Sequence, residues 1–284
     1  MPSPPDPLRS WGKVARRGAA QAVRGPDPAR REQSDSHARR SSRAPAREEQ
    51  DQWIEEPRSA ASPAPVTARR SRPQRRLPES VGRELLRALG AKDAPAAERR
   101  LLDAGAALDR GRAGDAIRMA RPLVKLTPDI AAVREVAGMA SYRLGNWNVA
   151  AEHLEAFARL SGSTDLHPML ADCYRAIKRY RRADEVWDEL RRASPSATVV
   201  TEGRIVAAGA LADQGRLAEA ISLLERGPVK KRRSPADHHL RLWYVLADLY
   251  ERAGDTVRAR ELFARVAEFD PALADTAERL GSLG

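Results

Sequence analysis

The sequence is poor in the residues that build reactive sites. It contains one cysteine, Cys173, and five histidines. A single thiol forms no internal disulfide and no multi-cysteine metal site. His238 and His239 are adjacent and point in different directions on a helix, which disfavours a shared metal. No phosphate-binding loop or dinucleotide fingerprint is present. We therefore predict no catalytic residues, no metal, no cofactor and no enzymatic activity.

Long apolar runs are also missing from the sequence. No stretch approaches the roughly 20 apolar residues of a membrane-spanning helix. The first residues, Met-Pro-Ser-Pro-Pro-Asp-Pro, have no apolar core of the kind found in secretory signals. These absences predict a soluble cytoplasmic protein that has no membrane contact.

Residues 1–78 have few of the side chains that form a core. They contain six Leu, Ile or Val, no Phe or Tyr, and 12 of the 20 prolines. They also carry 17 Lys and Arg against 9 Asp and Glu, so +8 of the net charge of +11 lies here. Such composition predicts a disordered tail, because too little apolar surface is available to offset the ordering entropy. A basic tail favours anionic partners, and the alternative is a purely solubilising segment.

The rest of the chain is organised by a repeat with a period of about 34 residues. Its clearest copy runs from Leu240 to Pro271 and contains a recurring order of large, small, turn, small and large residues. The positions that carry this order are Trp243, Leu246, Ala247, Tyr250, Gly254, Asp255, Ala259, Phe263, Asp270 and Pro271. A fixed period of this length is typical of stacked helical hairpins.

The repeat predicts an all-α solenoid within residues 79–284. Its hairpins are expected at 97–130, 131–163, 164–197, 201–227 and 240–273. A lead-in helix at 79–89, stopped by Gly90, should cover one end of the stack, and a capping helix at 272–281, ended by Gly281, the other. A basic insertion separates the last two copies, and Ser234 with Pro235 is expected to start the helix after it.

The recurring residues have packing roles. Only small side chains fit where the two helices of a hairpin cross, which places Ala247 against Ala259 and Gly138 against Ala150. The turn glycines supply a positive φ, and in the third copy Lys178 stands in their place.

These residues resemble tetratricopeptide repeats, with five tandem copies over about 97–273. The stretch from Val133-Arg-Glu-Val-Ala-Gly through Tyr142-Arg-Leu-Gly to Leu170-Ala-Asp-Cys also resembles a narrower group, actinobacterial repeat proteins with an Arg-rich N-terminal arm. The first resemblance implies a groove, lined by the first helices of the hairpins, that holds a peptide or protein segment. The second implies a bacterial cytoplasmic adaptor.

Carried onto this chain, the resemblance selects a candidate partner groove of mixed charge with two tyrosines and a methionine. Its residues are Glu135, Met139, Tyr142, Arg143, Asp172, Arg175, Tyr244, Asp248, Glu251 and Arg252. Arginine pairs with carboxylates and aromatic rings add contact area, which suits an extended peptide. The alternative for each position is an ordinary solvated surface residue that binds no partner.

Basic clusters give a second set of candidate contacts. They comprise Arg69, Arg70, Arg72, Arg75, Arg76, Lys230, Lys231, Arg232 and Arg233. The favoured function is a protein-binding scaffold with a flexible basic arm. The alternative is an RNA- or DNA-associated accessory protein whose arm supplies weak, salt-dependent affinity. A further possibility is that the acidic segment around Trp53 folds back into the protein's own groove. The sequence identifies neither the partner nor the oligomeric state.

Overall fold

The computed structural model describes residues 76–283. The predicted disordered tail lies outside these residues except for its last three positions, and so do the segment around Trp53 and four of the basic candidates. Those four are Arg69, Arg70, Arg72 and Arg75.

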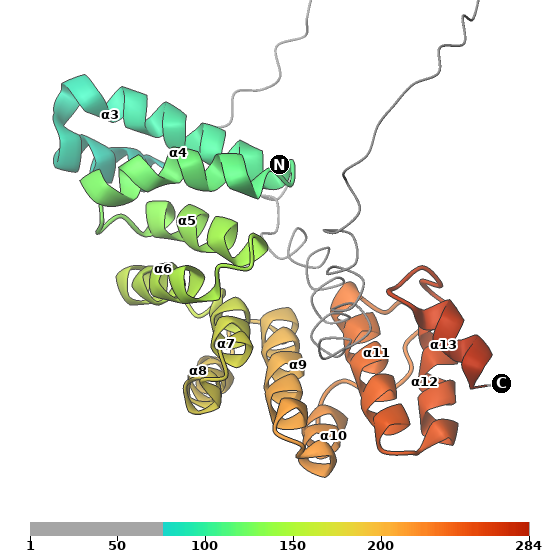
Figure 1. Ribbon diagram of the computed structural model, residues 1–284. Coiled ribbons are helices and arrows are strands. Elements are labelled where there is room, and N and C mark those ends of the chain that lie inside the picture. Colours follow the sequence, from blue (N-terminus) through green and yellow to red (C-terminus); the bar gives the residue numbers. More distant parts are fainter. Residues whose placement is uncertain (1–75, 284) are drawn as a thin grey trace, which may run out of the picture. The chain divides into compact units, whose positions relative to one another are not determined.

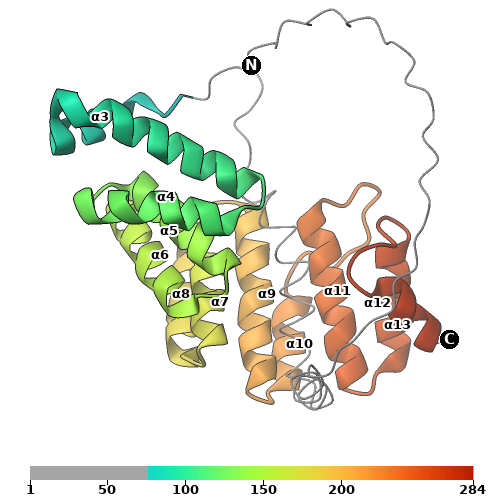
Figure 2. The ribbon, with the colours of Figure 1, turned by 45° about the horizontal axis from the view of Figure 1, so that its top comes forward.

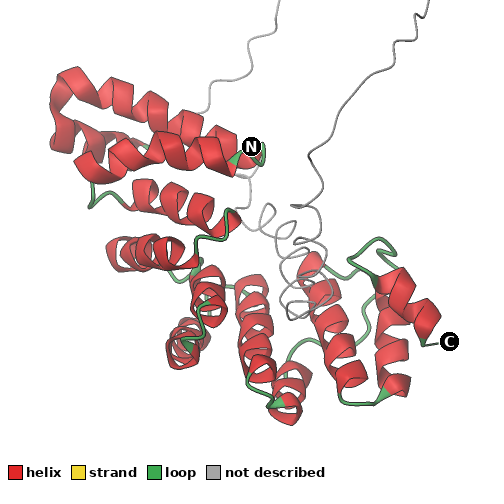
Figure 3. Ribbon diagram, viewed as in Figure 1, coloured by secondary structure: helices red, strands yellow, loops and turns green. Residues whose placement is uncertain are grey.

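Helices make up the regular structure of the described part of the chain (Figure 3). Their bounds are α3 Glu79–Asp109, α4 Ala113–Leu126, α5 Ala131–Arg143, α6 Trp147–Ser161, α7 His167–Ala176, α8 Tyr180–Ala193, α9 Ala197–Asp213, α10 Leu217–Glu225, α11 Asp237–Arg252, α12 Thr256–Ala267 and α13 Thr276–Ser282. Gly90 interrupts α3 with φ 75° and ψ 170°. The element is therefore two helices, a lead-in helix before Gly90 and the first helix of the first hairpin after it.

The helices pair in chain order and each pair stacks on the next (Figures 1 and 2). The second part of α3 pairs with α4, and the pairs α5–α6, α7–α8, α9–α10 and α11–α12 follow. Each second helix also contacts the first helix of the next pair, and α9 touches both α7 and α11. The predicted fold class is thereby confirmed for the described residues: five helical hairpins with a lead-in helix and a capping helix.

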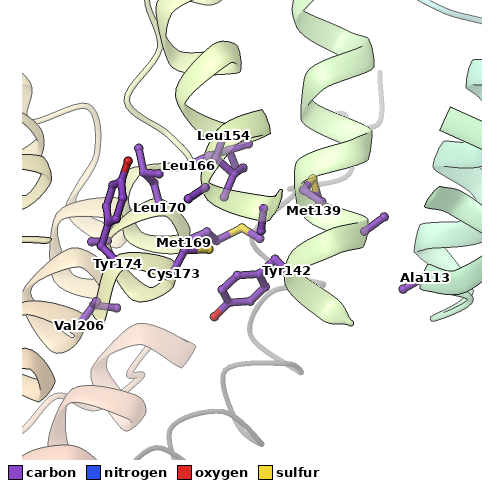
Figure 4. Close-up of a cluster of buried hydrophobic side chains, with 14 of the residues drawn as sticks. Ala113, Met139, Tyr142, Leu154, Leu166, Met169, Leu170, Cys173, Tyr174 and Val206 are labelled. Atoms are coloured by element: carbon purple, nitrogen blue, oxygen red, sulfur yellow. The ribbon is translucent and has the colours of Figure 1, made fainter. Parts of the chain in front are cut away.

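The core consists of clusters that each join neighbouring hairpins. One cluster links the first three hairpins and Val206 of the fourth, and Figure 4 shows its side chains around Met169, Cys173 and Tyr142. Another joins the fourth hairpin, the fifth hairpin and α13 around Trp243 and Phe263, both fully buried. Each hairpin therefore buries its apolar face only against its neighbours, as expected for a repeat protein.

Small residues lie at the helix crossings. Ala247 and Ala259 are both fully buried. A Cβ atom on Gly138 would lie 2.9 Å from the Cδ2 of Leu154, so Leu154, one turn beyond Ala150, is the side chain that fills this crossing. The close approach of the helices was predicted correctly, while the contact at Gly138 comes from a larger side chain than expected.

The turns inside the hairpins require a left-handed residue. Gly145 has φ 73° and Gly254 has φ 84°. Lys178 occupies the same turn position in the third hairpin and also adopts a left-handed conformation, with φ 59°. The turn geometry is thus retained even where the sequence places a side chain on it.

The start of α11 differs from its prediction. The residue that precedes the helix is Ala236, whose backbone N–H donates to Nδ1 of His239 at 3.2 Å. Ser234 and Pro235 lie before the helix, so their predicted roles as cap and first turn are wrong. The extended backbone of Ala236, with ψ 163°, separates them from the helical residues.

The capping helix also begins later than expected. Leu273 is buried, and the Thr276 hydroxyl donates to its carbonyl at 2.5 Å. This contact holds residues 272–275 in turns, and α13 therefore starts at Thr276. Gly281 lies inside α13, so the prediction that it ends the helix is wrong.

Replacing Ala259 with leucine should overpack the crossing of α11 and α12. We expect a loss of about 1–3 kcal/mol in the free energy of unfolding, measured by thermal or urea denaturation. Ala264→Leu on the exposed side of the same helix is the matched control and should change stability little. Equal stability of the two variants would contradict the packing role of Ala259.

Replacing Lys178 with glycine should relieve a left-handed backbone. The conformation costs an L-residue roughly 1–2 kcal/mol, partly offset by the larger chain entropy of glycine. We expect Lys178→Gly to raise the free energy of unfolding by about 1 kcal/mol. Lys178→Ala keeps the strain and should give no gain, so a gain in the alanine variant would assign the effect to the lysine side chain instead.

Candidate functional site

The ten candidate groove residues come from the first helices of three hairpins. Helix α5 carries Glu135, Met139, Tyr142 and Arg143, helix α7 carries Asp172 and Arg175, and helix α11 carries Tyr244, Asp248, Glu251 and Arg252. The structure places seven of them in two polar clusters, one spanning α5, α7 and α9, the other joining α11 to the C-terminal segment.

The first cluster is a chain of polar contacts, here called the polar ladder: Tyr142, Asp172, Arg175 and Asp213. The Tyr142 hydroxyl donates to Oδ2 of Asp172 at 2.6 Å. Arg175 donates to the other Asp172 oxygen at 3.3 Å, and its Nε donates to Asp213 at 2.6 Å. Three consecutive hairpins are therefore tied together through side chains on their first helices.

Burial and charge act against each other at Arg175. The side chain is 9% exposed, and burial alone lowers the pKa of a guanidinium. The carboxylates of Asp172 and Asp213 outweigh burial and raise the pKa of Arg175 above its ordinary value. The ladder thus holds a buried cation by pairing it with two acids.

A glycine makes room for the ladder. A Cβ atom on Gly209 would lie 2.9 Å from the Cζ of Arg175, so the guanidinium rests directly on α9. Gly209 and Asp213 were not among the predicted groove residues, because the fourth copy matches the repeat signature only loosely.

A second pair of residues was also missed. Arg241 of α11 donates from Nε to the Glu202 carboxylate of α9 at 2.6 Å, and both side chains are buried. The two residues occupy the same position relative to Gly215 and Gly254, the turn glycines of their hairpins. Opposite charges at one repeat position in consecutive copies were the available signal.

The predicted groove residues of α11 meet the capping segment. The Tyr244 hydroxyl donates to Asp275, and Arg279 of α13 donates to Asp248 at 2.5 Å. Arg279 also pairs with Glu251 at 3.1 Å, while Arg252 lies 3.7 Å from Asp248. These groups therefore attach α13 to the end of the stack.

Burial shifts the acid at the centre of this cluster. Asp248 is fully buried, and burial raises the pKa of its carboxyl group even though Arg279 and Arg252 act to lower it. Burial likewise raises the pKa of Tyr244. The cluster around Asp248 is consequently a tightly enclosed contact between α11 and α13.

The remaining candidates of α5 belong to neither cluster. Arg143 donates to the carbonyl of Leu108, and burial lowers the pKa of its guanidinium. Burial and the nearby Asp165 raise the pKa of Glu135. Met139 is buried in the core cluster of the first three hairpins.

The basic candidates within the described residues differ in their contacts, since one is in an ion pair and the others are exposed. Lys231 pairs with Glu268 at 2.6 Å. Lys230, Arg232 and Arg233 are exposed on the insertion between α10 and α11. Arg76 is exposed ahead of α3.

Reactive groups are enclosed. Cys173 is fully buried, and burial raises the pKa of its thiol, which disfavours the nucleophilic thiolate. Within residues 76–283, no group of three or more His, Cys, Asp or Glu is placed to hold a metal ion. None of the helices described combines the length and apolar character needed to cross a membrane.

Removing Arg175 should loosen the contact between α7 and α9. Arg175→Met leaves Asp172 and Asp213 without their shared cation, and we expect a loss of about 1–3 kcal/mol in the free energy of unfolding. Arg191→Met is the control, because it removes an exposed pair with Asp188 and should cost less than about 1 kcal/mol. Comparable losses in urea denaturation would contradict a structural role for the ladder.

Comparison with known proteins agrees with the geometry. The sequence model of a family described as tetratricopeptide repeat matches residues 101–163 and 229–274. No curated protein matches the chain. The solved structure of TTC0263, a thermophilic tetratricopeptide-repeat protein of Thermus thermophilus, is similar with a TM-score of 0.51 and 18% identity, over 66% of this chain and 98% of that one.

Two further solved structures are similar at lower scores. MamA gives a TM-score of 0.44 at 19% identity, over 63% of this chain and 96% of that one. YrrB, described as a tetratricopeptide-repeat protein with an unusual peptide-binding site, gives 0.42 at 21% identity, over 64% of this chain and 91% of that one. Residues 101–163 and 229–274 thus resemble tetratricopeptide repeats in sequence, and the five stacked hairpins of the described residues have the corresponding fold.

Proposed function

We propose that the chain is a non-enzymatic adaptor that binds a peptide or protein segment along the first helices of its hairpins. The tetratricopeptide fold itself is typical of protein-interaction scaffolds. The finer proposal, a binding face centred on α5, α7 and α9, is supported by the polar ladder.

The ladder is the observation that carries this proposal. An extended peptide offers alternating N–H donors and C=O acceptors, and it binds best to partners that are already fixed in place. Tyr142, Asp172 and Arg175 are fixed relative to one another by hydrogen bonds of 2.6 and 3.3 Å. They combine a phenol, a carboxylate and a guanidinium on adjacent first helices, so little side-chain entropy is lost when a peptide binds.

The α11 candidates contribute differently in this proposal. Tyr244 and Asp248 are hydrogen-bonded to Asp275 and Arg279 of the C-terminal segment, whereas Glu251 and Arg252 keep 28% and 32% of their side-chain surface exposed. We therefore place the binding face on α5, α7 and α9, with Glu251 and Arg252 at its margin.

The alternative predictions for the tail depend on residues that the structure does not describe. Deleting residues 1–78 separates them. If the shortened chain stays folded but loses its partner in capture experiments, the arm carries the affinity. If capture improves, the segment around Trp53 competes for the groove. Unchanged capture favours a groove that acts alone.

A peptide selection tests the binding face. Peptides enriched from a random library on the full chain should bind the Tyr142→Phe and Asp172→Asn variants about tenfold more weakly than the wild type, measured by calorimetry. The first variant removes a hydroxyl group from the face, and the second removes a negative charge. Both substitutions conserve side-chain size, which keeps the fold intact.

Asp188→Asn, on the exposed side of the second helix α8, is the matched control and should leave the affinity within about twofold of the wild-type value. The proposal is contradicted if the control weakens binding as much as the ladder variants do, or if no peptide is enriched.

A further inference from the structure

The basic insertion between α10 and α11 is held in place by the folded stack. Arg265 of α12 donates to the carbonyl of Val229 at 2.9 Å. A Cβ atom on Gly227 would lie 3.1 Å from the Cδ of Arg204 in α9, whose guanidinium donates to the carbonyl of Leu223 near the end of α10. A Cβ atom on Gly227 would lie 2.8 Å from the side chain of Leu242 in α11, so the loop packs closely on that helix. The insertion is therefore anchored to three helices.

The cations of the insertion differ in their contacts. Lys231 forms an ion pair with Glu268 at 2.6 Å, which adds a fourth contact that holds the insertion in place. The other four cations of the insertion are exposed, and no ion pair joins them to an acid within residues 76–283. They are Arg226, Lys230, Arg232 and Arg233, here called the basic loop.

The acids around the basic loop are mostly committed to other partners. Glu268 pairs with Lys231, and Asp188 pairs with Arg191 at 3.1 Å. Glu225 accepts from the Tyr250 hydroxyl and lies 3.6 Å from Arg258. None of these three acids forms an ion pair with a cation of the basic loop.

Neighbouring groups respond to this positive potential. The pKa of Arg204 is lowered by burial and further by Arg226 and Arg191. Burial, His239 and Arg232 lower the pKa of His238 to about 4. Cations that depress one another in this way mark a surface where an anion would be stabilised.

The surface lacks what a protein partner needs. Protein interfaces depend on apolar or aromatic anchors at their centre. The exposed large apolar residues of the described chain all lie away from the insertion, and they are Leu86, Leu126, Leu144, Val149 and Val257. The nearby Trp187 and Trp243 are buried. A phosphodiester backbone requires cations alone, and bases find no exposed ring here to stack on.

We propose that the basic loop is a binding surface for the phosphodiester backbone of a nucleic acid, independent of base sequence and separate from the proposed peptide face. Arginine suits this ligand because its guanidinium meets phosphate oxygens in a bidentate fashion. Binding should weaken steeply as salt rises, since contacts of this kind gain from counterion release.

The test compares two triple variants of the full chain. Lys230→Ala, Arg232→Ala and Arg233→Ala together remove the centre of the basic loop and leave the Lys231 anchor intact. Arg99→Ala, Arg100→Ala and Arg121→Ala together remove the same charge from exposed positions of the first hairpin. Both are titrated with labelled oligo(dT), single-stranded RNA and duplex DNA of about 20 nucleotides by fluorescence anisotropy over a range of salt.

The loop variant should bind oligo(dT) roughly tenfold more weakly than the control variant at low salt, and its slope of log affinity against log salt should be smaller by about 2, at about 0.7 for each lost contact. A ranking among the three nucleic acids identifies the preferred form. Equal affinities and slopes for the two variants overturn the proposal. So does a loop variant that loses affinity for a polyglutamate peptide while keeping its affinity for the oligonucleotides.

Discussion

The fold depends on the close crossing of the two helices in each hairpin. Fully buried Ala247 and Ala259, and Gly138 beneath Leu154, let the helix axes approach until larger residues interlock around them. Because a hairpin of this kind cannot enclose its own apolar face, it must stack on a neighbour. The clusters that join successive hairpins, the lead-in helix and α13 follow from this requirement.

Polar contacts restrict how the hairpins stack but contribute little to the net stability of the stack. The ladder from Tyr142 to Asp213 connects three hairpins, and the buried pair of Glu202 and Arg241 connects the fourth to the fifth. The contact of Arg279 with Asp248 attaches α13 to the fifth hairpin. Buried charges contribute little net stability, but an unpaired one is costly, so they restrict which arrangement of neighbours is tolerated. In the proposed function, the groups of the ladder also supply the donors and acceptors of the binding face.

The repeated hairpins could be predicted from the sequence. Small residues, turn glycines and large side chains recur at fixed spacing, so the hairpins could be predicted, even with Lys178 in a glycine position. The polar links could not, because Asp213 meets Arg175 only after two different hairpins are stacked. The contacts that hold the insertion were hidden for the same reason, since Arg204 of α9 packs on Gly227 and Arg265 of α12 donates to Val229. The helix starts at Asp237 and Thr276 were misjudged because other local contacts set them, from the Ala236 amide to His239 and from the Thr276 hydroxyl to the Leu273 carbonyl.

The central functional claim is that the first helices, and not the second ones, form the partner surface. Hydrogen–deuterium exchange of the full chain, with and without a selected peptide, tests it most directly. We expect peptide binding to slow amide exchange in α5, α7 and α9 and to leave exchange in α6, α8 and α10 unchanged. Protection confined to the second helices, or spread equally over both sets, would contradict it.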